Sequence, residues 1–233
     1  MSAAGSASFT VAGAELVADP LGGLWWPAER LLAVADLHFE KGSSFAARGR
    51  PLPPYDTIDT LAALARLIAH YRPAQVVALG DSFHDPYAYQ RLTAQHRAAI
   101  AALQAGRRWV WIAGNHDPMP PARLGCAGIG GEVADELRLG PLSFRHQPTP
   151  GPAPGEIAGH LHPAAKLRGA GGSVRRRCFA TCGARVVMPA LGAYAGGLNV
   201  RDAAFAPLFP AGFAALMLGA KVYPVASDRL WPD

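Results

Sequence analysis

Residues that bind metals or move protons gather in five short patches of the chain. The patches are Asp36-Leu-His38, Gly80-Asp81, Gly114-Asn-His-Asp117, His146 and Gly159-His-Leu-His162. Five of the eight histidines lie in these patches, and His84 follows the second patch closely. Carboxylate, imidazole and amide groups without a thiolate suit Mn, Fe or Zn and argue against a cysteine-type structural zinc site. The set therefore predicts two divalent ions that act on a phosphoester.

The patches differ in how specific they are. A lone Asp-x-His or Gly-Asp is common, and a single histidine such as His146 is more often an ordinary core or surface residue. Gly-Asn-His-Asp directly after an apolar segment is much more specific, and Gly-His-x-His in the expected order adds to it. The ordered set, more than any one patch, carries the metal prediction.

Three apolar segments end directly at patches. Residues 31–35, 75–79 and 109–113 are predicted to be buried strands that lead into Asp36, Gly80 and Gly114. Apolar residues at helical spacing predict helices over 55–70 and 87–105. Because open α/β sheets place their sites at the carboxyl ends of strands, we expect these three patches to converge.

The sequence pattern changes after Pro118, from strands alternating with helices to short strands alone. The opening residues 8–17 alternate like a strand, whereas the second half carries short predicted strands at 136–139, 142–146, 157–160, 173–181 and 185–188. An α/β half followed by a mostly β half predicts one domain, residues 1–233, with two sheets facing each other. The uncharged stretch 203–220 is broken by Pro and Gly, so we expect a buried loop and strand there instead of a membrane span.

Two patches contain ligands at positions i and i+2. In extended backbone such residues point to the same side, so Asp36 with His38, and His160 with His162, are each expected to reach a common ion. A glycine precedes three of the patches, which fits a sharp turn beside a crowded ion.

In this order the patches resemble those of the calcineurin-like metallophosphoesterases, over the span from Asp36 to His162. The resemblance implies an α/β fold, a four-layer α/β/β/α sandwich of two facing mixed β-sheets flanked by helices. It also implies seven metal ligands: Asp36, His38 and His162 for the first ion, Asn115, His146 and His160 for the second, and Asp81 for both.

The same resemblance assigns substrate-side roles. It implies that His116 is no ligand but contacts the phosphate, where it could donate a proton to the leaving oxygen. Asp117 is expected to orient His116. The Gly-Asp-x-Phe-His word is similar to one in double-strand-break repair nucleases, which adds His84 as a substrate-side residue. Those nucleases carry a capping domain for which this chain is too short.

A narrower resemblance covers nearly the whole chain. The words Asp36-Leu-His-Phe-Glu-Lys-Gly42, Gly80-Asp-Ser-Phe-His-Asp85 and Pro189-Ala-Leu-Gly-Ala-Tyr-Ala-Gly-Gly-Leu198 are similar to those of the bacterial DNA ligase-associated metallophosphoesterases. This implies a phosphodiesterase that nicks DNA with two divalent ions, Mn²⁺ first and Fe²⁺ or Zn²⁺ as alternatives. A hydroxide between the ions would attack phosphorus in line. It also implies a role in DNA repair beside a DNA ligase, an exonuclease and a helicase.

The basic side chains are nineteen Arg and three Lys, and the net charge is +5. Arg favours bidentate phosphate contacts, but a GC-rich genome would produce the same bias. The candidate substrate-binding residues are the basic ones near the patches: Lys41, Arg48, Arg145, Arg175, Arg176 and Arg177. Whether the last three face the metal centre or solvent stays open from the sequence.

Other features favour a cytoplasmic protein without a membrane segment. The three cysteines, Cys126, Cys178 and Cys182, match neither a zinc ribbon nor a disulfide scaffold and are expected to be buried thiols. No signal peptide is evident at the N-terminus. The apolar residues around 205–218 are expected either to pack in the core or to form the interface of a homodimer. Two rival functions remain: a phosphatase or nucleotide phosphodiesterase for a small substrate, and a non-catalytic scaffold.

Overall fold

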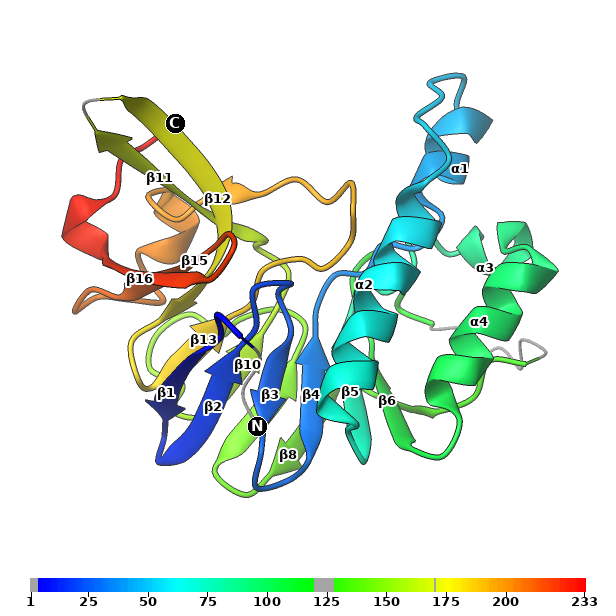
Figure 1. The fold of residues 1–233 in the computed structure, drawn as a ribbon, viewed down its shortest axis with the longest axis horizontal. Coiled ribbons are helices and arrows are strands. Elements are labelled where there is room, and N and C mark those ends of the chain that lie inside the picture. The colour runs from blue at the N-terminus through cyan, green and yellow to red at the C-terminus, as the bar shows by residue number, and fades with distance from the viewer. Residues whose placement is uncertain (1–3, 120–127, 170) are drawn as a thin grey trace.

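The computed structural model describes residues 4–119, 128–169 and 171–233, so Cys126 lies outside the described residues. The first sheet has seven strands in chain order (Figure 1): β1 (Ala7–Val11), β2 (Ala14–Ala18), β3 (Leu24–Trp26), β4 (Leu31–Val34), β5 (Gln75–Leu79), β6 (Arg108–Ile112) and β7 (Glu132–Ala134). The strands from β1 to β4 pair antiparallel and those from β4 to β7 pair parallel, so the sheet is mixed.

The second sheet is built from the second half of the chain. Its main path runs in the order β14 (Leu198–Asn199), β11 (Pro163–Gly169), β12 (Gly172–Thr181), β13 (Arg185–Val187), β10 (Glu156–Ala158), β9 (Leu142–Arg145) and β8 (Glu136–Leu139). Two further strands, β15 (Ala214–Leu218) and β16 (Val222–Ala226), continue from β12. Parallel pairing of β9, β10 and β13 within antiparallel neighbours makes this sheet mixed as well.

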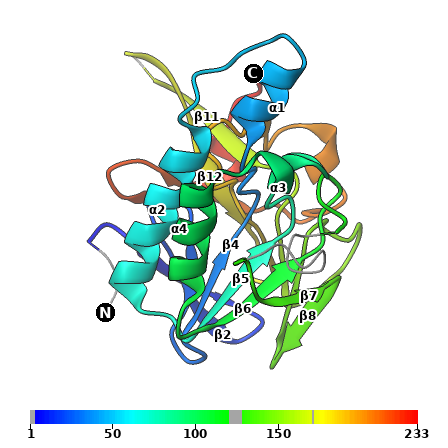
Figure 2. The ribbon, with the colours of Figure 1, turned by 90° about the vertical axis from the view of Figure 1, so that its right-hand side faces the viewer.

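Helices α2 (Asp56–Tyr71) and α4 (Ala94–Gln104) cover the outer face of the first sheet (Figure 2). Two shorter helices are α1 (Lys41–Ala47), which lies beyond the sheet in this view, and α3 (Ala88–Arg91). Leu64 and Leu67 of α2, each 1% exposed, belong to the same apolar cluster as Trp109 and Trp111 of β6. This cluster holds the helices on the sheet because each helix buries one apolar stripe.

A second apolar cluster fills the space between the sheets. Leu31 and Val110 from the first sheet meet Phe144 and Phe179 from the second, and none is more than 1% exposed. The outer face of the second sheet is covered by the segment 200–213, which includes the 3-10 helix η1 (Ala203–Phe205). The prediction of two facing mixed sheets flanked by helical elements is confirmed.

Several local predictions need correction. The predicted strand at 8–17 is a hairpin, because Ala12 and Gly13 turn the chain with φ of 47° and 85°. The predicted helix at 87–105 is two helices, and the Thr93 side chain caps the second by accepting the His96 N–H at 3.0 Å. Cys178 is buried as expected, but Cys182 is exposed.

The uncharged stretch 203–220 forms η1, a loop and β15, as the sequence predicts. Among the described residues, no helix combines the length and the hydropathy that a membrane crossing requires.

Candidate metal centre

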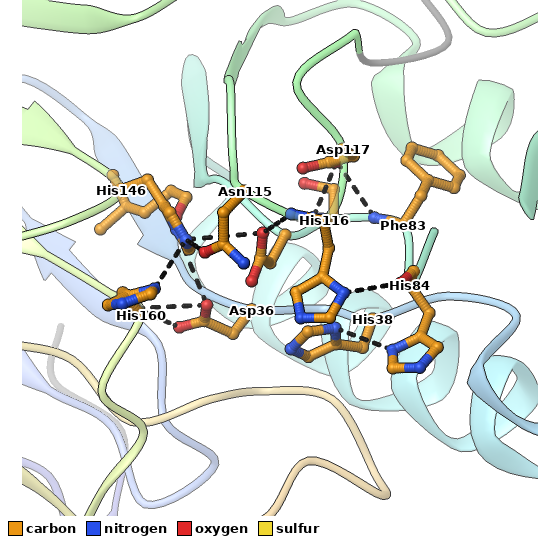
Figure 3. Close-up of polar contacts among 12 residues, drawn as sticks. Asp36, His38, Phe83, His84, Asn115, His116, Asp117, His146 and His160 are labelled. Atoms are coloured by element: carbon orange, nitrogen blue, oxygen red, sulfur yellow. Dashed lines mark hydrogen bonds and ion pairs between the residues drawn. The ribbon is translucent and has the colours of Figure 1, made fainter. Parts of the chain in front are cut away.

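The carboxyl ends of three neighbouring parallel strands supply the first half of the site. Asp36 follows β4, Asp81 follows β5 and Asn115 follows β6. The second sheet supplies His146 just after β9 and the segment 159–162 between β10 and β11. Figure 3 shows Asp36 and Asn115 from the first sheet pointing toward His146 and His160 from the second. The convergence predicted from the strand ends is therefore present.

One group of possible ligands consists of Asp36, His38 and His162, whose ligand atoms all lie within 4.8 Å of one another. His162 Nε2 is 3.3 Å from Asp36 Oδ1 and 3.4 Å from His38 Nε2. Asp36 is fully buried, and both of its carboxylate oxygens accept the backbone N–H of His160. A buried carboxylate with two imidazoles beside it is a donor set that divalent Mn, Fe and Zn accept.

The second group consists of Asp81, His146 and His160 within the same distance limit. His146 Nε2 lies 3.4 Å from Asp81 Oδ1 and 3.1 Å from His160 Nδ1. The amide oxygen of Asn115 is 2.8 Å from the same His146 nitrogen, so Asn115 joins this group. His146 Nδ1 lies 2.9 Å from the carbonyl oxygen of Leu79, which fixes the ring so that Nε2 faces the group.

The donor set fits a pair of cations. Ring nitrogens that face each other at 3.1–3.4 Å repel when both carry a lone pair or both carry a proton, and a shared cation removes that repulsion. Burial, with added repulsion from His162, His84 and Lys41, lowers the pKa of His38 to about 2. His38 is therefore neutral at ordinary pH, which is the state that binds a metal.

The pKa of His162 shifts in the opposite direction to that of His38. Burial works to lower its pKa, but the hydrogen bond to Asp36 and the negative charges of Asp36 and Asp81 outweigh burial and raise it. Asp81 also acts to raise the pKa of His160, although burial and His146 lower that pKa overall. Asp81 thus lies within electrostatic reach of one histidine from each group.

The backbone at the ligands corrects the expectation of extended pairs. Asp36, His38, Asp81, His160 and His162 all have positive φ, between 46° and 70°. This left-handed region is unfavourable for residues with a Cβ, and such strain gathers at functional sites. His160 and His162 join different groups, as the family resemblance implies and unlike the common ion that their i, i+2 spacing alone suggests.

Glycines leave room for this crowded arrangement. A Cβ on Gly80 would lie 2.5 Å from the ring of His146, and Gly80 itself has φ of 74°. A Cβ on Gly114 would lie 2.2 Å from Asp81 Oδ1. Gly80 and Gly114 are therefore required by the close approach of His146 and Asp81, as the sequence suggests.

Two of the three substrate-side candidates, His84 and His116, lie beside His38 of the first group. His84 is 8% exposed, its Nδ1 is 3.3 Å from His38 Nδ1, and its ring stacks on that of His116 with centroids 5.2 Å apart. Burial, followed by the charge of Lys41, lowers the pKa of His84 to about 4. His116 Nδ1 lies 2.9 Å from the carbonyl oxygen of His84.

Asp117 does not orient the ring of His116, contrary to the prediction. Its Oδ2 accepts the backbone N–H groups of Ser82 and Phe83 at 2.9 and 3.1 Å, as Figure 3 shows. Burial and the neighbouring Asp81 raise the pKa of Asp117 well above the usual range. Asp117 therefore stabilises the turn after Asp81. The carbonyl oxygen of His84, and not Asp117, orients the His116 ring.

The basic candidates divide between two places. Lys41 and Arg48 flank α1, and both charges act on the pKa of His84, so they lie on the His84 side of the centre. Arg145 instead bonds Thr149 and lies 3.8 Å from Glu156. Helix α1 itself was not predicted, because its seven residues are too few to show helical periodicity.

The three consecutive arginines lie elsewhere. Arg175 pairs with Asp233 at 2.9 Å, Arg177 donates to the carbonyl oxygen of Ala190, and Arg176 is exposed. Among the described residues, none of the three makes a hydrogen bond to a candidate ligand.

Sequence reasoning gave no role to the segment 190–192. The Leu191 N–H donates to the carbonyl oxygen of Ala35 at 2.8 Å, and the Gly192 N–H donates to that of Asp36 at 3.1 Å. The segment therefore supports the turn that presents Asp36. The only sequence signal was the word Pro189-Ala-Leu-Gly-Ala, which contributed to the narrower resemblance.

Comparison with known proteins agrees with this geometry. The family model described as calcineurin-like phosphoesterase matches residues 29–169, which contain all seven candidate ligands. The chain belongs to this family. As a calcineurin-like phosphoesterase it is a metal-dependent hydrolase, and its two groups of possible ligands are candidate sites for divalent ions.

Among solved structures, a nuclease MPE from Pseudomonas putida is similar to this phosphoesterase. The two share 28% sequence identity with a TM-score of 0.71, over 94% of this chain and 100% of that one. Yfce, a phosphoesterase from E. coli, matches at 15% identity and a TM-score of 0.40, over 87% of this chain and 96% of that one. Among curated proteins, none matches the sequence.

Proposed function

We propose that this phosphoesterase is an endonuclease that hydrolyses phosphodiester bonds of DNA with two divalent ions. The observation that carries the proposal is the pair of adjoining ligand groups with a further histidine pair, His84 and His116, next to one of them. The similarity to the P. putida nuclease over nearly the full chain supports DNA as the substrate.

The seven ligands have defined roles in the proposal. Asp36, His38 and His162 would hold one ion, Asn115, His146 and His160 would hold the other, and Asp81 would serve both. The charges that Asp81 exerts on His160 and His162 support its bridging position. When bound, the two ions polarise the phosphoryl group and provide an activated water for in-line attack.

His116 acts on the leaving oxygen. Its Nδ1 donates to the His84 carbonyl, so Nε2 is the nitrogen left for substrate. As the imidazolium, with a second proton on Nε2, His116 would donate to a phosphate oxygen or pass that proton to the leaving oxygen. His84 stacks on this ring and restricts its rotation. Lys41 and Arg48 supply positive charge on the same side, where they would hold the phosphate next to the cleaved one.

Several finer features belong to the proposal. Mn²⁺ is the preferred ion, with Fe²⁺ or Zn²⁺ as alternatives, because a mixed carboxylate, imidazole and amide set suits these ions. The cellular role is DNA repair in the cytoplasm, in functional association with a DNA ligase, an exonuclease and a helicase. A homodimer is compatible with this role.

The direct test is nicking of supercoiled plasmid by the purified protein with Mn²⁺, Mg²⁺, Zn²⁺ or a chelator. Asp81→Ala serves as the paired variant because Asp81 is 2% exposed and lies in the second ligand group. We expect nicking with Mn²⁺ that is absent with chelator, and joint loss of metal and activity in the variant. An Asp81→Ala protein that keeps two ions per chain would show that Asp81 does not bridge.

A small phosphoester is the alternative substrate. The same centre could serve a phosphatase or a nucleotide phosphodiesterase, since the ligands alone do not select a polymer. Intact plasmid beside rapid hydrolysis of bis(p-nitrophenyl) phosphate or a monoester would favour this alternative over the nuclease.

A further inference from the structure

Two surface hollows adjoin on the side of the molecule where β12 meets the β15–β16 turn. One has a volume of about 420 Å³ and is lined by Pro20, Arg175, Arg176, Arg177, Leu218 and Gly219. The other, of about 720 Å³, shares Pro20 and Gly219 and continues to α2, which contributes Arg66 and His70. We call the two hollows together the arginine groove, after Arg66, Arg175, Arg176 and Arg177.

Positive charge dominates this groove. Arg66, Arg175 and Arg176 are exposed, and among the described residues Arg66 and Arg176 take part in no ion pair. Asp19 also lines the groove, but it is 4% exposed and its carboxylate accepts the Tyr71 hydroxyl at 2.8 Å. Buried and hydrogen-bonded, Asp19 offsets little of the cationic character.

The strand that carries the three arginines has an open edge here. β12 pairs with β11 through Arg177, but its other edge meets β15 only from Cys178 onward. In the described structure, the edge of β12 before Cys178 therefore faces the groove without a partner strand. Figure 1 shows the β11–β12 hairpin extending beyond the β15–β16 turn. Backbone N–H groups and guanidinium groups together are the donors that hold phosphates.

One short segment connects the groove with the metal centre. Arg177 donates to the carbonyl oxygen of Ala190, while the Gly192 N–H donates to the carbonyl oxygen of Asp36. Two residues of chain span at most about 7 Å. The groove thus ends against the segment that supports the first ligand group.

We propose that the arginine groove binds the phosphates of a DNA strand that extends from the metal centre. This inference rests on the proposed nuclease function and adds the path of the substrate. Guanidinium groups bind phosphates through paired N–H donors regardless of base sequence. The groove therefore contributes affinity for polymeric DNA and nothing to a small diester, which reaches only the metals.

The experiment compares two double variants of equal charge. Arg66→Ala with Arg176→Ala removes the two unpaired arginines of the groove. Arg108→Ala with Arg138→Ala removes two exposed arginines that line neither hollow and that pair with Glu132 and Glu136. Each protein is assayed for DNA binding at several salt concentrations, for plasmid nicking with Mn²⁺, and for hydrolysis of bis(p-nitrophenyl) phosphate.

We expect the groove variant alone to bind DNA at least about tenfold more weakly, with a salt slope smaller by about one per lost phosphate contact. Its hydrolysis of the small diester should equal that of the parent. Equal DNA binding and salt slopes in both double variants would overturn the inference. The arginines would then serve only to keep the open edge of β12 from pairing with another chain. A parent protein that does not nick DNA would instead overturn the proposed function.

Discussion

At the scale of single residues, the hydrogen bond from His116 Nδ1 to the His84 carbonyl determines what His116 can do. A carbonyl oxygen only accepts, so Nδ1 carries the proton and Nε2 is the nitrogen left for substrate. His116 belongs to neither ligand group. Its imidazole can therefore be removed without removing a metal ligand.

His116→Ala should lower turnover of a phosphodiester by about 10²- to 10⁴-fold, the usual contribution of a positioned acid or base. The metal content should stay at two ions per chain. Turnover and metal analysis are measured beside His70→Ala, which removes an exposed imidazole on α2. Loss of metal from His116→Ala would assign His116 to the ligands instead.

The raised pKa of His162 predicts a pH dependence of metal binding. A divalent ion binds the neutral imidazole, so a proton on His162 competes with it below the raised pKa. In the metal-free protein, protonated His162 contributes stability below its ordinary pKa of 6.5, and this contribution is lost as the pH rises through the raised value.

Mn²⁺ affinity should therefore increase as the pH rises through the pKa of His162 and level off above it. Calorimetric titration in two buffers of different ionisation enthalpy measures both the affinity and the protons released. An affinity that stays constant from roughly pH 5 to 8 would contradict the competition.

At the scale of elements, a buried ion pair holds the connection between His146 and the next strand. Glu156 of β10 and Arg185 of β13 are paired residues on neighbouring strands. Arg185 Nη2 lies 3.4 Å from Glu156 Oε2, and each residue is 2% exposed. Arg185 also donates to the carbonyl oxygens of Thr149 and Gly151 at 3.0 and 2.8 Å. The pair thereby anchors the loop that follows His146.

Glu156→Ala should destabilise the protein by about 3–5 kcal/mol, because it leaves the Arg185 guanidinium buried without its partner. Urea unfolding measures this loss. Glu136→Ala is the matched control, since it removes the partner of Arg138, which is 81% exposed, and should cost less than about 1 kcal/mol. Equal losses of unfolding free energy in the two variants would show that the buried ion pair stabilises the protein no more than the exposed one.

At the scale of the whole molecule, the cluster between the sheets joins the two halves of the chain. Phe144 of the second sheet is 1% exposed and lies with its ring 6.4 Å from that of Trp26 in the first. Neither sheet can bury this face alone. We therefore expect residues 1–233 to unfold as one cooperative unit.

Phe144→Ala should lower the free energy of unfolding by about 3–5 kcal/mol while a single transition remains. Thermal unfolding is followed by near-UV circular dichroism for tertiary packing and by far-UV circular dichroism for secondary structure. Tyr223→Ala, at an exposed position, is the control and should change little. Two separate transitions would contradict the single-domain prediction.

The sequence by itself determined the composition of the centre. Asp36, Asp81 and Asn115 could be recognised because each follows a short apolar strand, and parallel strands end at a common edge. The change from an α/β half to a mostly β half then predicted the two facing sheets. These features are local in the chain, so residue type and spacing are enough to reveal them.

Only the tertiary structure decided what surrounds each of these residues. Asp36 and His38 share a group whereas His160 and His162 do not, although all four have left-handed backbone, so a spacing of two residues does not set the division. Asp117 bonds the turn after Asp81, and Arg175 to Arg177 lie in a groove beyond Ala190. The destination of a polar side chain depends on which distant segment offers it a partner, and packing of the two sheets sets that choice.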